Sequence, residues 1–179
     1  MKKNLLLLSL FVCFAFTSNA QEKENTSLPQ QYQQIMGKII DKIPAVTTPA
    51  SQLLDFAKSF IGTRYRYASS NPNIGFDCSG FVSYVYKQFG FSGARSSVDF
   101  ARKGKTIALS EAKLGDILIF TGTNTKSRTA GHVGIIYSKD EDGNIKFIHS
   151  SSGKANGVTI TGLDGYYKSR FIKAVSILE

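Results

Sequence analysis

One cysteine and two histidines are the side chains of this sequence whose types point most directly to catalysis. Cys78 lies in the segment at residues 75–81, and His132 and His149 are the two histidines of the chain. A thiolate attacks carbonyl carbons, a neighbouring imidazole can take the thiol proton, and a third polar group can orient that imidazole. We therefore predict that Cys78 is a nucleophile, His132 its general base and His149 the residue that orients the base.

Cysteine and histidine are also ligands of zinc, so a metal site is the competing interpretation of the same residues. One cysteine and two histidines could form an open site with three protein ligands. The sequence lacks the close ligand spacing, such as His-x-x-x-His, that is typical of many zinc sites. We favour nucleophilic catalysis and expect neither a metal nor another cofactor.

The first twenty residues have the layout of a secretory signal peptide. Lys2 and Lys3 precede a run of apolar residues, and a polar segment follows Ala20. The run is too short to cross a hydrocarbon core of about 30 Å. We expect residues 1–20 to be cleaved after Ala20, no transmembrane segment, and export to the periplasm, the cell envelope or the extracellular space.

Cysteine usage supports a reactive thiol at Cys78. The other cysteine, Cys13, would leave with the signal peptide, and a single thiol would then enter a compartment where thiols normally pair. Such a thiol is either buried and inert or retained for its reactivity. Attachment of a lipid to Cys13 is a less favoured alternative, because the branched Val12 precedes it where lipoprotein signals have a small residue.

The formal net charge is +9, and the lysines and arginines are spread along the chain. This composition indicates a soluble basic surface or attraction to an anionic partner, which for an exported protein is the cell wall or the membrane surface. No zinc-finger spacing and no aromatic motif for single-stranded nucleic acid occurs, so nucleic acid is not an expected partner. The protein is expected to be a monomer.

The predicted elements place Cys78 at the start of a helix. Apolar residues recur at helical spacing from Cys78 to Phe89, and Gly90 is the predicted end. An earlier helix is predicted over residues 48–62. Amides at a helix N-terminus lower the pKa of a thiol and can bind the oxyanion that forms when a carbonyl is attacked.

The second half of the chain consists of short β-rich segments. Strands are predicted at residues 117–120, 133–137, 145–148, 158–160 and 171–177. A turn at residues 142–144 would place His132 and His149 together on one rim of the sheet. The order predicts an α+β fold in which N-terminal helices pack on a central antiparallel sheet. Residues 51–179 are the predicted catalytic domain, and residues 21–50 are an N-terminal extension.

Four segments together resemble the NlpC/P60 family of papain-like cell-wall cysteine peptidases. They are residues 76–82, 114–120, 131–135 and 147–150, and the resemblance extends over about residues 51–178. It implies the papain-like fold of that family. It also implies hydrolysis of amide bonds in peptidoglycan stem peptides, between D-glutamate and the adjacent diamino acid or at the peptide cross-link.

The resemblance also implies roles for single residues. It assigns to Cys78, His132 and His149 the same three roles that their residue types predict. Tyr65 is similar to a tyrosine of the family that helps form the oxyanion hole and the substrate pocket.

Three further residues are implied to bind substrate. Asp77 and Ser79 are expected to contact the free amine or backbone of the stem peptide. Arg95 is expected to bind a substrate carboxylate through two hydrogen bonds. The chain departs from the family pattern at residues 68–69 and at Phe100, which leaves substrate choice open.

Two other functions stay open at this point. A related amidase or acyltransferase could use the same three residues on another acyl donor. A wall-binding protein without catalysis is less favoured, because it would not need an oxidisable thiol.

Overall fold

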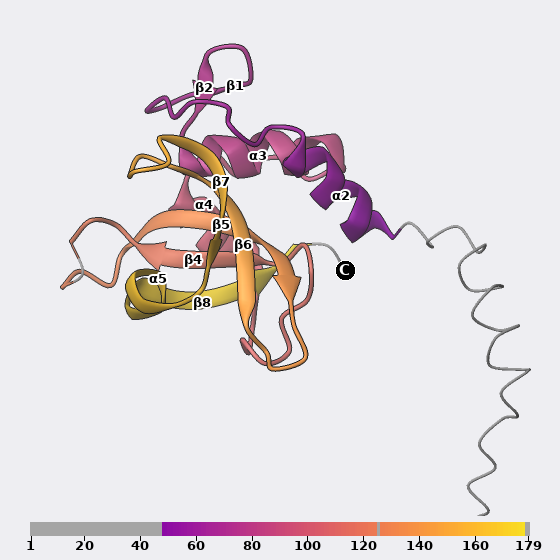
Figure 1. Cartoon of the computed structure of the whole chain (residues 1–179), viewed down its shortest axis with the longest axis vertical. Coiled ribbons are helices and arrows are strands. Elements are labelled where there is room, and N and C mark those ends of the chain that lie inside the picture. The colour runs from indigo at the N-terminus through magenta and orange to yellow at the C-terminus, as the bar shows by residue number, and fades with distance from the viewer. Residues whose placement is uncertain (1–47, 125, 178–179) are drawn as a thin grey trace, which may run out of the picture. The chain divides into compact units, whose positions relative to one another are not determined.

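Short helices and a large sheet make up the part of the chain that the structure describes, residues 48–124 and 126–177 of a computed structural model. The predicted signal peptide, the possible lipid site at Cys13 and most of the predicted extension lie outside these residues. In chain order the elements are α2 (Pro49–Lys58), β1 (Ser70–Asn71), β2 (Gly75–Phe76), α3 (Cys78–Gln88), α4 (Ser97–Lys103), β3 (Lys105–Ile107), β4 (Ile117–Thr121), β5 (Ala130–Lys139), β6 (Ile145–Ser151), β7 (Gly157–Gly162), α5 (Gly165–Arg170) and β8 (Phe171–Ser176) (Figure 1).

Helices α2 and α3 begin where polar side chains bind their first backbone N–H groups. Thr48 Oγ1 accepts a hydrogen bond from the N–H of Ser51 at 3.1 Å, and Asp77 Oδ1 accepts one from the N–H of Gly80 at 2.5 Å. These caps stabilise the helix because the N–H groups of a first turn have no acceptor within it. Cys78 is the first residue of α3, which confirms the prediction that it begins a helix.

The large sheet has the strand order β3-β8-β4-β5-β6-β7, and every neighbouring pair is antiparallel. Side chains alternate between its two faces. Ile119 of β4 belongs to the core that contains the apolar residues of α2 and α3, whereas Phe120 packs with Tyr167 of α5 in a second core. Figure 1 shows α2 and α3 on one side of the sheet and α5 on the other. The predicted α+β fold is confirmed.

Strands β5 and β6 form the predicted hairpin. Asn144 closes its turn by donating its N–H to Asp140 Oδ1 at 2.7 Å. Ile135 of β5 lies opposite Ile148 of β6. This register places His132 and His149 at the end of the hairpin that is remote from the turn.

Several short elements were not predicted from the sequence. The β1–β2 pair, β3, α4 and α5 are each at most seven residues long. Strands of two or three residues, and helices of two turns or fewer, contain too few residues to establish an apolar period. Helix α4 instead depends on a capping box, in which Ser96 and Asp99 bind each other's backbone N–H groups.

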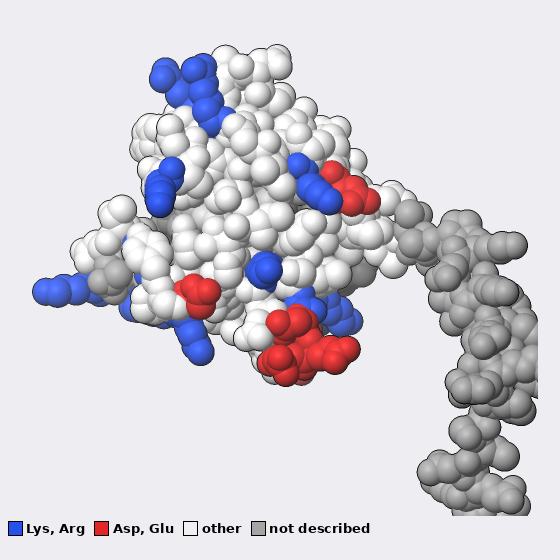
Figure 2. Space-filling view, in the orientation of Figure 1, with Lys and Arg blue, Asp and Glu red and all other residues white. Residues whose placement is uncertain are grey.

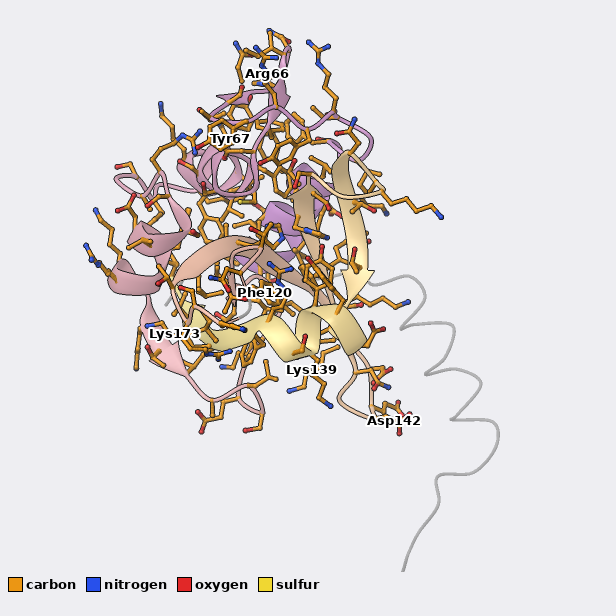
Figure 3. The ribbon with its side chains drawn as sticks, turned by 90° about the vertical axis from the view of Figure 1, so that its left-hand side faces the viewer. Arg66, Tyr67, Phe120, Lys139, Asp142 and Lys173 are labelled. Atoms are coloured by element: carbon orange, nitrogen blue, oxygen red, sulfur yellow. The ribbon has the colours of Figure 1, made fainter. Side chains whose placement is uncertain are left out.

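Charged residues are distributed over the surface of the described part. Figure 2 shows lysine and arginine side chains at separate places around the visible face, and a group of acidic side chains at its lower end. Figure 3 places Asp142 at one end of the molecule and Arg66 and Tyr67 at the opposite end. Within residues 48–124 and 126–177, no helix is long and apolar enough to span a membrane.

Candidate active site

The thiol of Cys78 lies at the N-terminus of α3, partly buried and outside any disulfide. Burial, followed by the negative charge of Asp77, raises its pKa. The backbone N–H groups of Ser79, Val133 and Cys78 itself hydrogen-bond to the sulfur and act in the opposite direction, but they do not outweigh burial. The amides at the helix end therefore lower the pKa of this thiol as expected, but burial raises it further, and the net shift favours the neutral thiol.

Cys78 belongs to the helix on one face of the sheet, and the His132 ring lies on the other face. Helix α3 packs on one face through the core that contains Val133. The ring of His132, one residue earlier in β5, lies on the other face, 5.9 Å from the ring of Tyr167 in α5. The Val133 N–H hydrogen-bonds to the sulfur, so the thiol lies near the start of β5, and Cys78 and His132 line the same cavity.

The two histidines form a hydrogen-bonded pair. His132 Nε2 lies 2.8 Å from His149 Nδ1, and the two rings are nearly perpendicular, at 85°. His149 is fully buried, and its other nitrogen, Nε2, lies 2.9 Å from the hydroxyl oxygen of Thr161 in β7. His132 therefore uses Nε2 for His149, which leaves Nδ1 as the nitrogen that can take a proton from a thiol.

A glycine makes room for this pair. Gly134 follows His132 by two residues in β5, and a Cβ atom there would be 2.5 Å from Phe147 Cδ2 and 3.1 Å from His149 Cβ. The Phe147 ring packs against the His149 ring with centroids 4.6 Å apart. Phe147 thus packs on His149, and the missing side chain at Gly134 leaves space for both residues.

Both imidazoles are neutral at neutral pH. Burial, followed by the positive charge of Arg170, lowers the pKa of His132 to about 4. Burial, followed by the proximity of His132, also lowers the pKa of His149. A neutral thiol beside a neutral imidazole is the arrangement in which the base removes the proton as the nucleophile attacks.

The cavity in front of Cys78 and His132 has a volume of about 1090 Å³. Tyr65 lines it and is partly buried, and burial, followed by the proximity of the ionisable Cys78, raises the pKa of its hydroxyl. The backbone of Tyr65 is held by its N–H, which donates to Asn156 O at 2.9 Å. Phe120, which Figure 3 labels near the middle of the molecule, lines the same cavity. The remaining lining residues are Gly122, Thr123, Gly131, residues 151–155, Thr159, Thr161, Tyr166, Tyr167 and Arg170.

Asp77, Ser79 and Arg95 form a cluster beside Cys78 but are not among the cavity-lining residues. Arg95 donates to both carboxylate oxygens of Asp77, at 2.8 and 3.0 Å, and to Ser79 Oγ at 3.2 Å. The two parallel hydrogen bonds expected between Arg95 and a substrate carboxylate are thus made to Asp77. The substrate contacts of these three residues stay predictions.

Sequence reasoning missed three residues at the site: Thr161, Tyr167 and Arg170. The Tyr167 ring lies 5.2 Å from the His149 ring, and Arg170 is close enough to lower the pKa of His132. Thr161 pairs with Phe147 across β6 and β7. These residues reach the site only through strand register and through α5, so no local motif identifies them.

Among residues 48–124 and 126–177, no group of three or more histidine, cysteine, aspartate or glutamate side chains is arranged to hold a metal ion. The close approach of the two imidazoles is accounted for by their mutual hydrogen bond.

Comparison with known proteins gives consistent similarities. The model of the NlpC/P60 family matches residues 62–176. Murein DD-endopeptidase MepS/Murein LD-carboxypeptidase of Escherichia coli is 33% identical over 131 residues, which are 72% of this chain and 63% of that protein. The chain therefore spans less than two thirds of the length of this curated relative.

Solved structures agree with the fold. The NlpC/p60 domain of peptidoglycan hydrolase SagA is 28% identical with a TM-score of 0.58, and the match covers 73% of this chain and all of that domain. RipD of Mycobacterium tuberculosis, described as a non-catalytic NlpC/p60 domain protein adapted to peptidoglycan binding, is 17% identical with a TM-score of 0.58 over 74% of this chain and 99% of that chain. The likeness to RipD concerns the fold alone.

Proposed function

Because the chain belongs to the NlpC/P60 family, we propose that it is a cysteine peptidase that hydrolyses amide bonds in the stem peptides of peptidoglycan. The observation that carries the proposal is the cavity that Cys78 and His132 share, with His132 hydrogen-bonded to His149. The relative from Escherichia coli is named for hydrolysis of murein, which supports the same substrate class.

The first half of the reaction uses the neutral pair. His132 Nδ1 takes the proton of Cys78 as the sulfur attacks the carbonyl carbon of the substrate amide. The tetrahedral oxyanion accepts hydrogen bonds from the backbone N–H of Cys78 and the hydroxyl of Tyr65. The new imidazolium donates its Nε2–H to His149 Nδ1, which stabilises its charge.

The second half releases the products. The C–N bond breaks as His132 returns its proton to the leaving amine, and the acyl group stays on Cys78 as a thioester. Water then attacks the thioester, with His132 again accepting the proton, and the carboxylic acid leaves. The thiol is regenerated, and no cofactor enters the reaction.

The finer assignments belong to the same proposal. The cleaved bond is the one between D-glutamate and the diamino acid, or the peptide cross-link. Asp77 and Ser79 hold the N-terminus of α3 and contact the free amine or backbone of the stem peptide. The protein acts as a monomer after export, in the periplasm, in the envelope or outside the cell.

Mass spectrometry of purified stem peptides and sacculi tests the proposal. The mature protein is expected to release fragments with a new N-terminus on the diamino acid or on the cross-linking residue, and Cys78→Ala is expected to release none. New ends on muramic acid would indicate an amidase instead.

A wall-binding function without catalysis is the second candidate, supported by the fold that the chain shares with RipD. Alkylation separates the two candidates. At a pH high enough to form the thiolate of its raised-pKa thiol, Cys78 of a peptidase is expected to be alkylated by iodoacetamide, and the protein is expected to lose activity in proportion. Absence of cleavage together with an unreactive Cys78 would favour the binding protein.

A further inference from the structure

We propose that Arg170 binds a carboxylate group of the substrate residue whose amine leaves. The inference rests on the proposed function, since it concerns the same cavity. The inference adds a binding residue for the half of the substrate that carries the leaving amine. It also predicts that this half carries a negative charge.

Arg170 is a buried cation that faces the cavity. It is the last residue of α5, its exposed fraction is 6%, and it lines the cavity together with Cys78 and His132. One end of the guanidinium, Nη1, donates to the Tyr166 hydroxyl, and Cζ lies 4.5 Å from the centroid of the Tyr166 ring. The exposed Tyr166 ring therefore holds the guanidinium at the cavity wall.

The charge of Arg170 has no carboxylate partner in the described part of the chain. Within residues 48–124 and 126–177, the one ion pair joins Arg95 and Asp77. Besides Tyr166, Arg170 donates only to Thr121 O, at 3.5 Å. A guanidinium keeps its charge at every relevant pH and has five N–H donors. A buried charge without a partner is costly, and a carboxylate from the cavity would supply two acceptors in matching geometry.

The position of Arg170 indicates that it contacts the half of the substrate that carries the leaving amine. His132 delivers the proton to the leaving amine, so that amine must approach the face on which the His132 ring lies. Arg170 belongs to α5, which covers the same face, and its charge acts on His132. The Asp77–Arg95 cluster belongs to the opposite side, at the N-terminus of α3.

Binding of a carboxylate would also make the base stronger. The positive charge of Arg170 lowers the pKa of His132 in the empty cavity, although burial has the larger effect. A bound carboxylate would neutralise that charge, so the pKa of His132 would rise in the substrate complex. A substrate with the carboxylate would therefore bind more tightly, and it would also meet a stronger base at His132.

The test uses peptides that differ only in this charge. Each peptide carries the diamino acid whose amine leaves. One form has both carboxyl groups of this residue free, a second has only the α-carboxyl amidated, and a third has only the other carboxyl amidated. Because either carboxyl could be the ligand, the two amidated forms distinguish the sources. We expect kcat/KM to be about tenfold to a hundredfold higher for the peptide whose binding carboxylate is free than for the peptide in which that carboxylate is amidated. This factor corresponds to the typical contribution of hydrogen bonds to charged groups.

Variants locate the effect. Arg170→Met is expected to abolish the preference, and Arg170→Lys to retain part of it. Lys168→Met is the matched control, because it removes an exposed positive charge from the same helix outside the cavity. Thermal unfolding of each variant checks the fold. Equal preference in Arg170→Met and in the unchanged protein would overturn the proposal.

Binding measurements separate this proposal from the proposed function. The same peptides are titrated into Cys78→Ala and into Cys78→Ala with Arg170→Met by calorimetry. A carboxylate preference that disappears with Arg170 supports the proposal even if the unchanged protein cleaves none of the peptides, which would contradict the peptidase alone. No binding difference between free and amidated peptides contradicts the role of Arg170.

Discussion

His132 Nε2 lies 2.8 Å from His149 Nδ1, so the hydrogen on one ring determines the hydrogen on the other. For His132 to accept a proton at Nδ1, its own hydrogen must be on Nε2 and must point to His149 Nδ1. The hydrogen of His149 is then on Nε2, which faces the hydroxyl oxygen of Thr161 at 2.9 Å. The Thr161 hydroxyl can accept this hydrogen, so the chain from Thr161 to His132 is compatible with the tautomer that the proposed reaction needs.

Thr161→Val is expected to lower kcat/KM by about tenfold or more, because an unmet buried hydrogen bond costs about 1–3 kcal/mol. Without the hydroxyl, the hydrogen of His149 is better placed on Nδ1, where it would bind His132 Nε2 and keep the His132 hydrogen on Nδ1. Thr161→Ser retains the hydroxyl and is expected to retain activity. Equal rates for the valine and serine variants would contradict this role of Thr161.

The pH profile of kcat/KM is expected to be wide. Below a pH of about 4, His132 is protonated and cannot accept the thiol proton, so activity falls as pH decreases through that value. The pKa of Cys78 is raised, so the alkaline limb should lie at or above the ordinary thiol pKa of about 8.5. Rates measured on a short stem peptide from pH 3 to pH 10 test this. An acid limb between pH 6 and 7 would contradict the burial of His132.

Gly134→Ala is expected to destabilise the fold and to reduce activity. The added methyl group would meet Phe147 at 2.5 Å, and overpacking of this kind typically costs about 1–3 kcal/mol. Urea unfolding measures the loss. Gly122→Ala is the control for stability, because a Cβ there meets no atom closer than 3.7 Å. Similar unfolding free energies for the two variants would show that Phe147 and His149 adjust without cost.

Asp77→Asn is expected to lower the pKa of the Cys78 thiol. The change removes the negative charge that raises this pKa and keeps a side-chain oxygen that can cap α3. The pH dependence of alkylation by iodoacetamide gives the thiol pKa directly. Asp55→Asn, an exposed change in α2, is the control. A pKa that is unchanged or raised in Asp77→Asn would contradict the electrostatic effect of Asp77.

The elements that hold Cys78, His132 and His149 could be predicted because their signals are local. The apolar period that begins at Cys78 identifies α3, and the turn near Gly143 identifies the β5–β6 hairpin. These two elements are sufficient to bring the two imidazoles together at one end of the sheet.

The surroundings of these residues could not be predicted, because they depend on contacts between distant segments. Thr161 reaches His149 through the register of β6 and β7, and Arg170 arrives on a helix of six residues. The direction of the thiol pKa also needed the structure. The sequence indicates the helix amides that lower it, but not the burial that exceeds their effect.

The raised pKa of Cys78 has a consequence for the lifetime of the protein. Peroxides oxidise thiolates much faster than thiols. In the proposed reaction the sulfur stays protonated until a substrate carbonyl arrives, and this protects it from sulfenic acid formation between turnovers. An unpaired cysteine held in this way could remain usable in an oxidising environment without a reductant to repair it.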